Sequence, residues 1–170
     1  KNKVASILSN KNFYDGHIKR QNLINYLDQH SPFLHVYGTN NFLNLRSYIK
    51  PIDMYMQHTV LEYYKYYLMP ENHNQNFYVT EKLCEPILCE CLCFYWGCPN
   101  LHEMIDERCF IRLDISDLPG SYNTIANAIE NKEWEKRIDI IRKTKAKILN
   151  KYGALSHISS TIQTIEAHHN

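Results

Sequence analysis

Residues 65–83 read Lys-Tyr-Tyr-Leu-Met-Pro-Glu-Asn-His-Asn-Gln-Asn-Phe-Tyr-Val-Thr-Glu-Lys-Leu. The opening Lys65–Met69 is aromatic and apolar, which is typical of a buried strand, and Pro70 ends it. The polar stretch Glu71–Phe77 predicts a loop. Thr80 is a good helix N-cap, and a helix is expected from Thr80 to Glu90. A strand, a loop and a helix in this order are the repeating unit of a parallel sheet.

The same alternation continues on both sides of this stretch. Short apolar runs predict further strands at Lys3–Leu8, Phe33–Tyr37, Leu92–Trp96 and Cys109–Leu113. Helical patterns cover Gly16–His30, Met54–Tyr63, Tyr122–Asn131, Glu133–Lys151 and Ser156–Glu166. Thr39–Pro51 reads as a loop, and Pro86 is expected to kink its helix or mark a second helix start.

This order predicts a Rossmann-like α/β domain, in which helices cover both faces of a parallel sheet. We expect one domain over residues 1–170, with the helices from about residue 121 onward packed on it.

Composition narrows the class of protein. Hydrophobic residues make up 44% of the 170 residues, enough for a core, and the net charge of +1 favours neither nucleic acid nor anionic lipid as a partner. No apolar run reaches the roughly 18 residues that a membrane span needs, and no secretory signal opens the chain. The six cysteines fall mostly inside predicted elements, so we expect reduced thiols and a cytoplasmic setting.

Ligands of such folds bind beyond the carboxyl ends of the strands. The loops expected to form the site are therefore Ser9–Gly16, Gly38–Pro51, Pro70–Thr80 and Gly97–Asp106.

The helix start at Thr80 carries a candidate anion site. Lys82 lies in the first helical turn, where free backbone N–H groups already favour an anion. Glu81 would repel a phosphate and suits a neutral diol such as a ribose. Asn72 and Tyr78 add neutral hydrogen-bonding groups. Helix capping with solvent-exposed charges at Glu81 and Lys82 explains the same pattern without a ligand.

The loop after the first strand is a second candidate, because Arg20 can give two parallel hydrogen bonds to a phosphate. Alternatively, Lys19 and Arg20 are solvent-facing helix charges. His17, His73 and His102 lie in the predicted loops without an evident partner. The Cys89-x-Cys91-x-Cys93 pattern favours buried core over a metal site, which normally uses paired cysteines on turns.

Residues 64–72 and 78–83 resemble a known family motif. Tyr-Lys-Tyr-Tyr-Leu-Met-Pro-Glu-Asn followed by Tyr-Val-Thr-Glu-Lys-Leu is similar to the donor-binding motif of the alpha-1,3-fucosyltransferases, glycosyltransferase family 10. Phe94–Pro99, Phe110–Asp114 and the Ser9-Asn10 turn resemble further parts of the family pattern. The resemblance covers about residues 3–118.

The resemblance implies roles for these residues. Arg20 and Lys82 would bind the diphosphate of a GDP-sugar, and Glu81 would hold the ribose. Further residues would line the donor pocket: Asn72 and Tyr78, with Ser9, Asn10, Glu71 and Thr80 as additional candidates. The family fold has two Rossmann-like domains, and the chain matches the C-terminal one of a GT-B glycosyltransferase.

The resemblance also implies inverting transfer, with GDP-fucose as the expected donor, to a hydroxyl of a glycan acceptor, with no metal or other cofactor required. The general base would be a glutamate of an N-terminal acceptor domain, so no catalytic residue is assigned in this chain. Pro70, Cys84 and Pro86 depart from the family pattern and leave the donor sugar open. Two alternatives stay open: a non-catalytic module that binds a nucleotide-sugar or glycan, and a transferase that uses a different nucleotide-sugar.

Overall fold

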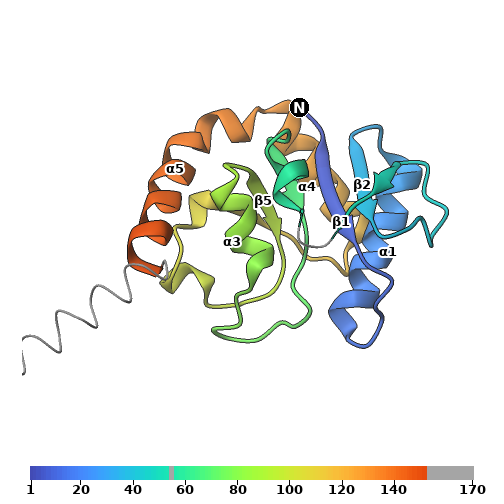
Figure 1. The fold of residues 1–170 in the computed structure, drawn as a ribbon, viewed down its shortest axis with the longest axis horizontal. Helices are drawn as coiled ribbons and strands as arrows, with labels where there is room; N and C mark the ends of the chain where they lie inside the picture. Colours follow the sequence, from blue (N-terminus) through green and yellow to red (C-terminus); the bar gives the residue numbers. More distant parts are fainter. Residues whose placement is uncertain (54–55, 153–170) are drawn as a thin grey trace, which may run out of the picture.

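Six parallel strands form the sheet of the computed structural model, which describes residues 1–53 and 56–152 (Figure 1). They are β1 (Val4–Leu8), β2 (Leu34–Gly38), β3 (Tyr48–Pro51), β4 (Tyr66–Leu68), β5 (Leu92–Tyr95) and β6 (Phe110–Arg112). The strand order is β3-β2-β1-β4-β5-β6, and every neighbouring pair is parallel. The predicted Rossmann-like α/β class is confirmed.

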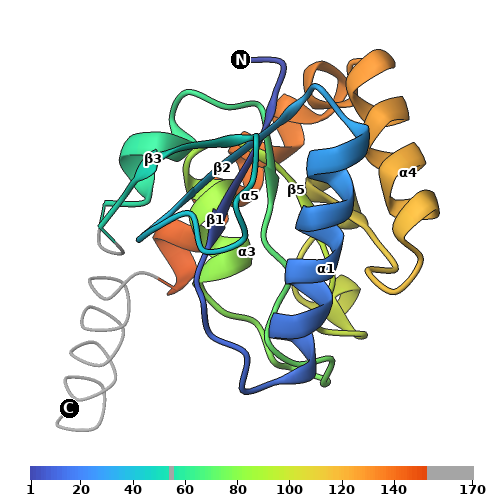
Figure 2. The same cartoon turned by 90° about the vertical axis from the view of Figure 1, so that its right-hand side faces the viewer.

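Helices cover both faces of the sheet (Figures 1 and 2). Helices α1 (Asp15–His30) and α4 (Leu118–Glu130) lie on one face, and α3 (Glu81–Leu88) and α5 (Glu133–Tyr152) on the other. Three short elements complete the order: α2 (His58–Leu61) and the 3-10 turns η1 (Leu101–Glu103) and η2 (Glu107–Cys109). None of the helices in the described part of the chain has the length and apolarity of a membrane span.

The central strands are apolar because both of their faces are covered. All residues of β1, β4 and β5 are buried, including the bulky Tyr66 and Tyr67. The polar member of β1, Ser6, donates its hydroxyl to the carbonyl of Leu68 at 2.7 Å, so its burial leaves no unpaired group. Tyr64, Tyr66 and Tyr67 thus serve as core packing, whereas Tyr63 is exposed.

The chain reverses its direction across the sheet between β1 and β4. From β1 it proceeds outward through β2 to β3, and from β4 it proceeds the other way through β5 to β6. The loops that leave β1 and β4 therefore diverge at the carboxyl edge and open a crevice between them. This switch point is where the candidate site lies.

Two predicted element boundaries are wrong. The end of the expected loop Thr39–Pro51 is strand β3, an edge strand that pairs only with β2. Its side chains are mostly exposed, so the sequence Tyr-Ile-Lys-Pro carries no apolar pattern that would reveal it. The helix expected at 54–63 is shorter, since only His58–Leu61 is helical among the described residues.

Pro86 lies inside α3, which continues through it without a second start. A proline has no N–H, so it cannot donate to the carbonyl of Lys82 one turn earlier. The thiol of Cys93 lies 3.9 Å from this carbonyl oxygen and partly replaces the missing donor. Packing against β5 therefore offsets part of the cost of the proline.

All six cysteines are free in the structure, as expected for reduced thiols, and four of them are buried. The cytoplasmic location stays a prediction, and so does the assignment of residues 1–170 to a single domain. The helix predicted at Ser156–Glu166 lies outside the described residues.

Candidate functional site

A cavity of about 620 Å³ opens at the carboxyl ends of β1, β2 and β4. Three of the four predicted loops contribute to it, and the loop Gly97–Asp106 does not. The lining residues come from the ends of β1 and β2, from the β1–α1 loop and α1, from the segments after β2, β3 and β4, and from the first turn of α3: Ile7, Leu8, Ser9, Asn10, Lys11, His17, Arg20, Gly38, Thr39, Ile52, Asp53, Gln57, Met69, Asn72, Glu81 and Lys82.

Arg20 is a buried cation in the wall of this cavity. Only 2% of the residue is exposed, and α1 holds it over the end of β4. One guanidinium nitrogen, Nη2, donates to Asn72 Oδ1 at 2.8 Å, and Nη1 lies 3.3 Å from the sulfur of Met69. Burial lowers the pKa of Arg20, but a guanidinium stays charged near neutral pH.

No carboxylate among the described residues forms an ion pair with Arg20. The carboxylates of Glu71 and Glu81 attract the charge of Arg20 without forming an ion pair with it, and a buried charge without a direct counter-ion is unfavourable by several kcal/mol. An anion in the cavity would supply the missing partner. The neighbouring Lys19, in contrast, pairs with Asp15 at 2.7 Å on the surface of α1. The alternative of a solvent-facing charge therefore holds for Lys19 and is wrong for Arg20.

Lys82 and Glu81 form an ion pair at the N-terminus of α3. Lys82 Nζ lies 2.6 Å from Glu81 Oε1, and the Lys82 side chain is only 10% exposed, against 53% for Glu81. Burial raises the pKa of Glu81, but the hydrogen bond and charge of Lys82 outweigh it and lower this pKa overall. Glu81 therefore stays ionised and Lys82 is held at the cavity wall. Both side chains reach the ligand space from the first helical turn.

Glu71, which is fully buried, holds the start of α3 in place. Its two carboxylate oxygens accept hydrogen bonds from the backbone N–H and the hydroxyl of Thr80, at 2.9 and 2.6 Å. Thr80 in turn caps the helix by accepting from the backbone N–H of Lys82 at 3.3 Å. Burial raises the pKa of Glu71, against the lowering effect of both Thr80 bonds. The pair orients the helix terminus that presents Lys82.

Close backbone packing joins the two sides of the cavity. A Cβ on Gly16 would lie 2.5 Å from the carbonyl oxygens of Glu71 and Asn72, so only glycine lets the first turn of α1 approach this loop. The β1–α1 loop is braced by Gln21, whose side-chain N–H groups donate to the carbonyls of Ser9 and Lys11 at 3.4 and 2.9 Å. These contacts place Ser9 and Asn10 beside Arg20.

The sequence model of glycosyltransferase family 10 (fucosyltransferase), C-terminal part, matches residues 1–147. The chain belongs to glycosyltransferase family 10. No curated protein matches the chain.

Several solved structures have a similar fold. An alpha1,3-fucosyltransferase with GDP-fucose is 20% identical at a TM-score of 0.62, and the match covers 81% of this chain and 38% of that one. An alpha1,3-fucosyltransferase with GDP is also 20% identical, at a TM-score of 0.61, and the match covers 80% of this chain and 37% of that one. The glycotransferase of kitacinnamycin is 11% identical at a TM-score of 0.62, over 95% of this chain and 43% of that one. The family 10 chain thus spans less than half the length of these solved proteins.

Six of the nine residues predicted for the donor site line the cavity of the family 10 chain: Ser9, Asn10, Arg20, Asn72, Glu81 and Lys82. Glu71 and Thr80 do not line it but support the start of α3. Tyr78 does not line it either and lies in the loop before α3, where its ring packs edge-on against His73 with centroids 5.4 Å apart. Their roles toward a ligand stay predictions.

The structure also adds residues that sequence reasoning left without a role. Lys11 and His17 belong to the predicted first loop and its helix start, so their position in the chain was a usable signal. Asp53 and Gln57 reach the cavity from the segment after β3, and no motif points to them. Their placement depends on the path of the chain beyond the edge strand.

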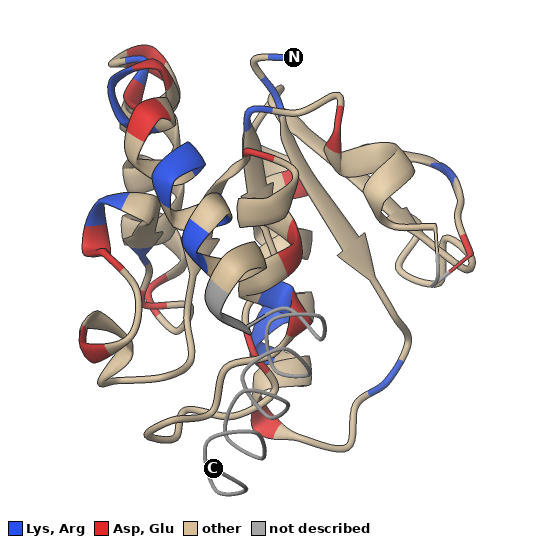
Figure 3. Cartoon of the chain, turned by 60° about the vertical axis from the view of Figure 1, so that its left-hand side comes forward, with Lys and Arg blue, Asp and Glu red and all other residues tan. Residues whose placement is uncertain are grey.

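Other candidate features fall outside this cavity. His102 lies in η1, in the loop that does not contribute. In the part of the chain that the structure describes, no three His, Cys, Asp or Glu side chains gather as metal ligands. Basic and acidic residues are interspersed over the described elements (Figure 3). The predictions on metal and nucleic acid remain predictions.

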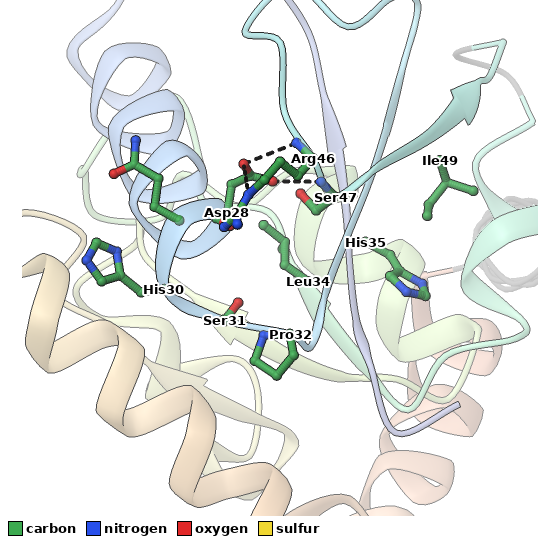
Figure 4. Close-up of a pocket in the computed structure, with 10 residues that line it drawn as sticks. Asp28, His30, Ser31, Pro32, Leu34, His35, Arg46, Ser47 and Ile49 are labelled. Carbon is green, nitrogen blue, oxygen red and sulfur yellow. Dashed lines mark hydrogen bonds and ion pairs between the residues drawn. The ribbon is translucent and has the colours of Figure 1, made fainter.

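A second cavity, of about 520 Å³, lies at the opposite, amino-terminal edge of the sheet (Figure 4). Its main charged group is Asp28, which is almost fully buried and accepts from the backbone N–H groups of Arg46 and Ser47 at 3.1 and 2.7 Å. Burial raises the pKa of Asp28, but these bonds outweigh it and lower the pKa overall. Asp28 thus fastens the segment before β3 to the end of α1, and we interpret this cavity as structural.

Proposed function

We propose that this chain is the donor-binding domain of a glycosyltransferase that uses a GDP-sugar, with GDP-fucose as the expected donor. The observation that carries the proposal is the buried, unpaired Arg20, which faces a cavity shared with Lys82 at the switch point of a family 10 fold. Two of the structurally similar proteins hold GDP-fucose or GDP, which supports a nucleotide of this kind.

The cavity walls suit the parts of such a donor. Arg20 and Lys82 approach from two different helices, so a diphosphate between them would neutralise both cations. Glu81 is an acceptor beside Lys82 and suits the two hydroxyl donors of a ribose. Asn72, held by Arg20, supplies a neutral amide near the junction of phosphate and sugar.

In the proposed reaction an acceptor hydroxyl attacks the anomeric carbon of the sugar, and GDP leaves from the opposite face. The bond from the sugar to the phosphate oxygen breaks, so the leaving diphosphate gains negative charge in the transition state. Arg20 and Lys82 stabilise this added charge more than they stabilise the bound donor, which lowers the barrier. The hydroxyl proton goes to a general base that we place in another domain of the full-length enzyme.

Calorimetry of the chain with nucleotides tests the proposal directly. GDP and GDP-fucose should bind, and UDP-glucose should bind at least ten times more weakly because its base and sugar differ. Incubation of the chain with GDP-fucose and a glycan acceptor should transfer no sugar. Absence of heat with every GDP compound would point to the non-catalytic alternative, and a clear preference for GDP-mannose would change the donor sugar.

A further inference from the structure

His17 is a buried group of the cavity wall that the proposed function has not used. It is the third residue of α1, only 5% of it is exposed, and it lines the cavity together with Arg20 and Lys82. The backbone N–H of Tyr14 donates to its Nδ1 at 3.3 Å, closing a capping interaction at the start of α1. Nδ1 is thus an acceptor, and the single ring proton of the neutral form sits on Nε2.

Cations surround this ring. Burial lowers the pKa of His17 below its ordinary 6.5, and the charges of Arg20, Lys82 and Lys11 lower it further, while a side-chain hydrogen bond with Asn72 opposes them. The positive end of α1 acts in the same direction as the cations. The titratable and charged groups on the neighbouring elements are Lys11, Tyr14, Asp15, Lys19 and Arg20 from the first loop and α1, Asp53 beyond β3, Glu71, His73 and Tyr78 before α3, and Glu81 and Lys82 on α3.

We propose that His17 is a third binding residue for the donor diphosphate, neutral in the empty cavity and protonated when the anion enters. This inference rests on the proposed function. A diphosphate places two negative charges among Arg20, Lys82 and His17, and nearby negative charge favours the protonated imidazole. His17, Arg20 and Lys82 all line this one cavity, so an anion bound in it interacts with all three.

Protonation changes one contact that the structure shows. Nδ1 then carries a proton and can no longer accept from the backbone of Tyr14. That bond is long at 3.3 Å, so little is lost compared with the attraction of two phosphate charges. The binding of each donor molecule should therefore take up a proton from solution in the pH range just around and below neutrality.

Calorimetry with GDP-fucose in two buffers of different ionisation enthalpy measures this uptake. GDP-fucose is the suitable ligand because both of its phosphates are esterified and do not titrate between pH 5.5 and 8. The terminal phosphate of GDP takes up a proton at about pH 6 and would add its own proton uptake to the measurement. The parent chain should take up a fraction of a proton, at most one, and its affinity should rise by up to about tenfold from pH 8 to pH 6, because a pKa raised by one unit on binding gives a tenfold gain once the pH lies below the pKa of the empty site.

The decisive variant is His17→Gln. Glutamine at the third helical position also accepts from the backbone at the N-cap, so the start of α1 keeps its support, but glutamine cannot be charged. We expect affinity within about twofold of the parent at pH 8, about tenfold weaker binding at pH 6, and proton uptake close to zero. His30→Gln, at the other end of α1 and outside this cavity, should retain the full pH dependence of the parent.

Four outcomes would overturn the inference. His17→Gln could retain the pH dependence and proton uptake of the parent, which would assign the titration to another group. The dependence could instead vanish in His73→Gln, which would assign it to the loop before α3. The parent could bind GDP-fucose with an affinity that does not change with pH, which would refute only the role of His17. A parent that binds no GDP-fucose at any pH would refute the proposed function as well.

Discussion

Replacing Arg20 with methionine separates a ligand-binding charge from a structural one. In the empty protein the substitution removes a cation that is only 2% exposed and forms no ion pair with a carboxylate of the described residues. Removing such a charge is worth up to several kcal/mol of stability. Against this gain stands the hydrogen bond to Asn72 Oδ1 at 2.8 Å, whose loss costs about 1–3 kcal/mol. The two effects oppose each other, so the free energy of unfolding should stay equal or rise.

Donor binding should respond in the opposite sense. A charged hydrogen bond to phosphate contributes about 1.5–3 kcal/mol, so Arg20→Met should weaken GDP binding by about 10- to 100-fold. Urea unfolding of the ligand-free chain and calorimetry with GDP give the two quantities separately. The expected result is a stable protein that has lost most of its affinity.

Arg112→Met is the matched control. The guanidinium of Arg112 donates to the carbonyls of Cys98 and Pro99, both at 3.0 Å, in a loop that does not line the cavity. This variant should lose stability and keep its GDP affinity. If Arg20→Met instead loses about 3–5 kcal/mol of stability, as a broken buried ion pair does, and still binds GDP normally, then Arg20 is a structural residue and the reasoning is refuted.

Three more predictions follow from single contacts. In the full-length enzyme, Lys82→Ala should lower turnover by about 10²-fold with an intact fold, and near-normal kinetics would remove Lys82 from the site. Gly97→Ala should lower the free energy of unfolding by about 2–4 kcal/mol in urea titrations, because Gly97 has φ +154° and a Cβ would lie 2.5 Å from Glu71 Cγ; an unchanged midpoint would contradict this packing. Asp28 has its pKa below the ordinary 3.8, so its stabilisation is present at neutral pH and is lost as pH falls through the lowered value. Asp28→Asn should therefore be about 1–3 kcal/mol less stable than the parent at pH 7, and a gap in urea midpoints that fails to narrow toward pH 3 would contradict the assignment.

The elements that the sequence predicted well are those that are buried on both faces and are therefore composed almost entirely of apolar residues. β1, β4 and β5 are covered on both faces, and their sequences are accordingly continuous apolar runs. β3 pairs on one side only and keeps most of its side chains in solvent, so the same logic could not find it. Pro86 does not mark a second helix start, because contacts with the neighbouring strand, including the thiol of Cys93, support the helix and are invisible in the local sequence.

The sequence by itself determined the chemistry of the switch-point loops: a capped helix with a lysine in its first turn, an arginine after the first strand, and a motif similar to family 10. Only the tertiary structure decided which of these charges are paired. Lys19 and Arg20 are adjacent in the chain, yet Lys19 meets Asp15 in solvent and Arg20 is buried against Asn72 without a carboxylate. The physical reason is geometric. Adjacent helical residues point about 100° apart, and only the packing of α1 against the end of β4 determines which one faces the cavity.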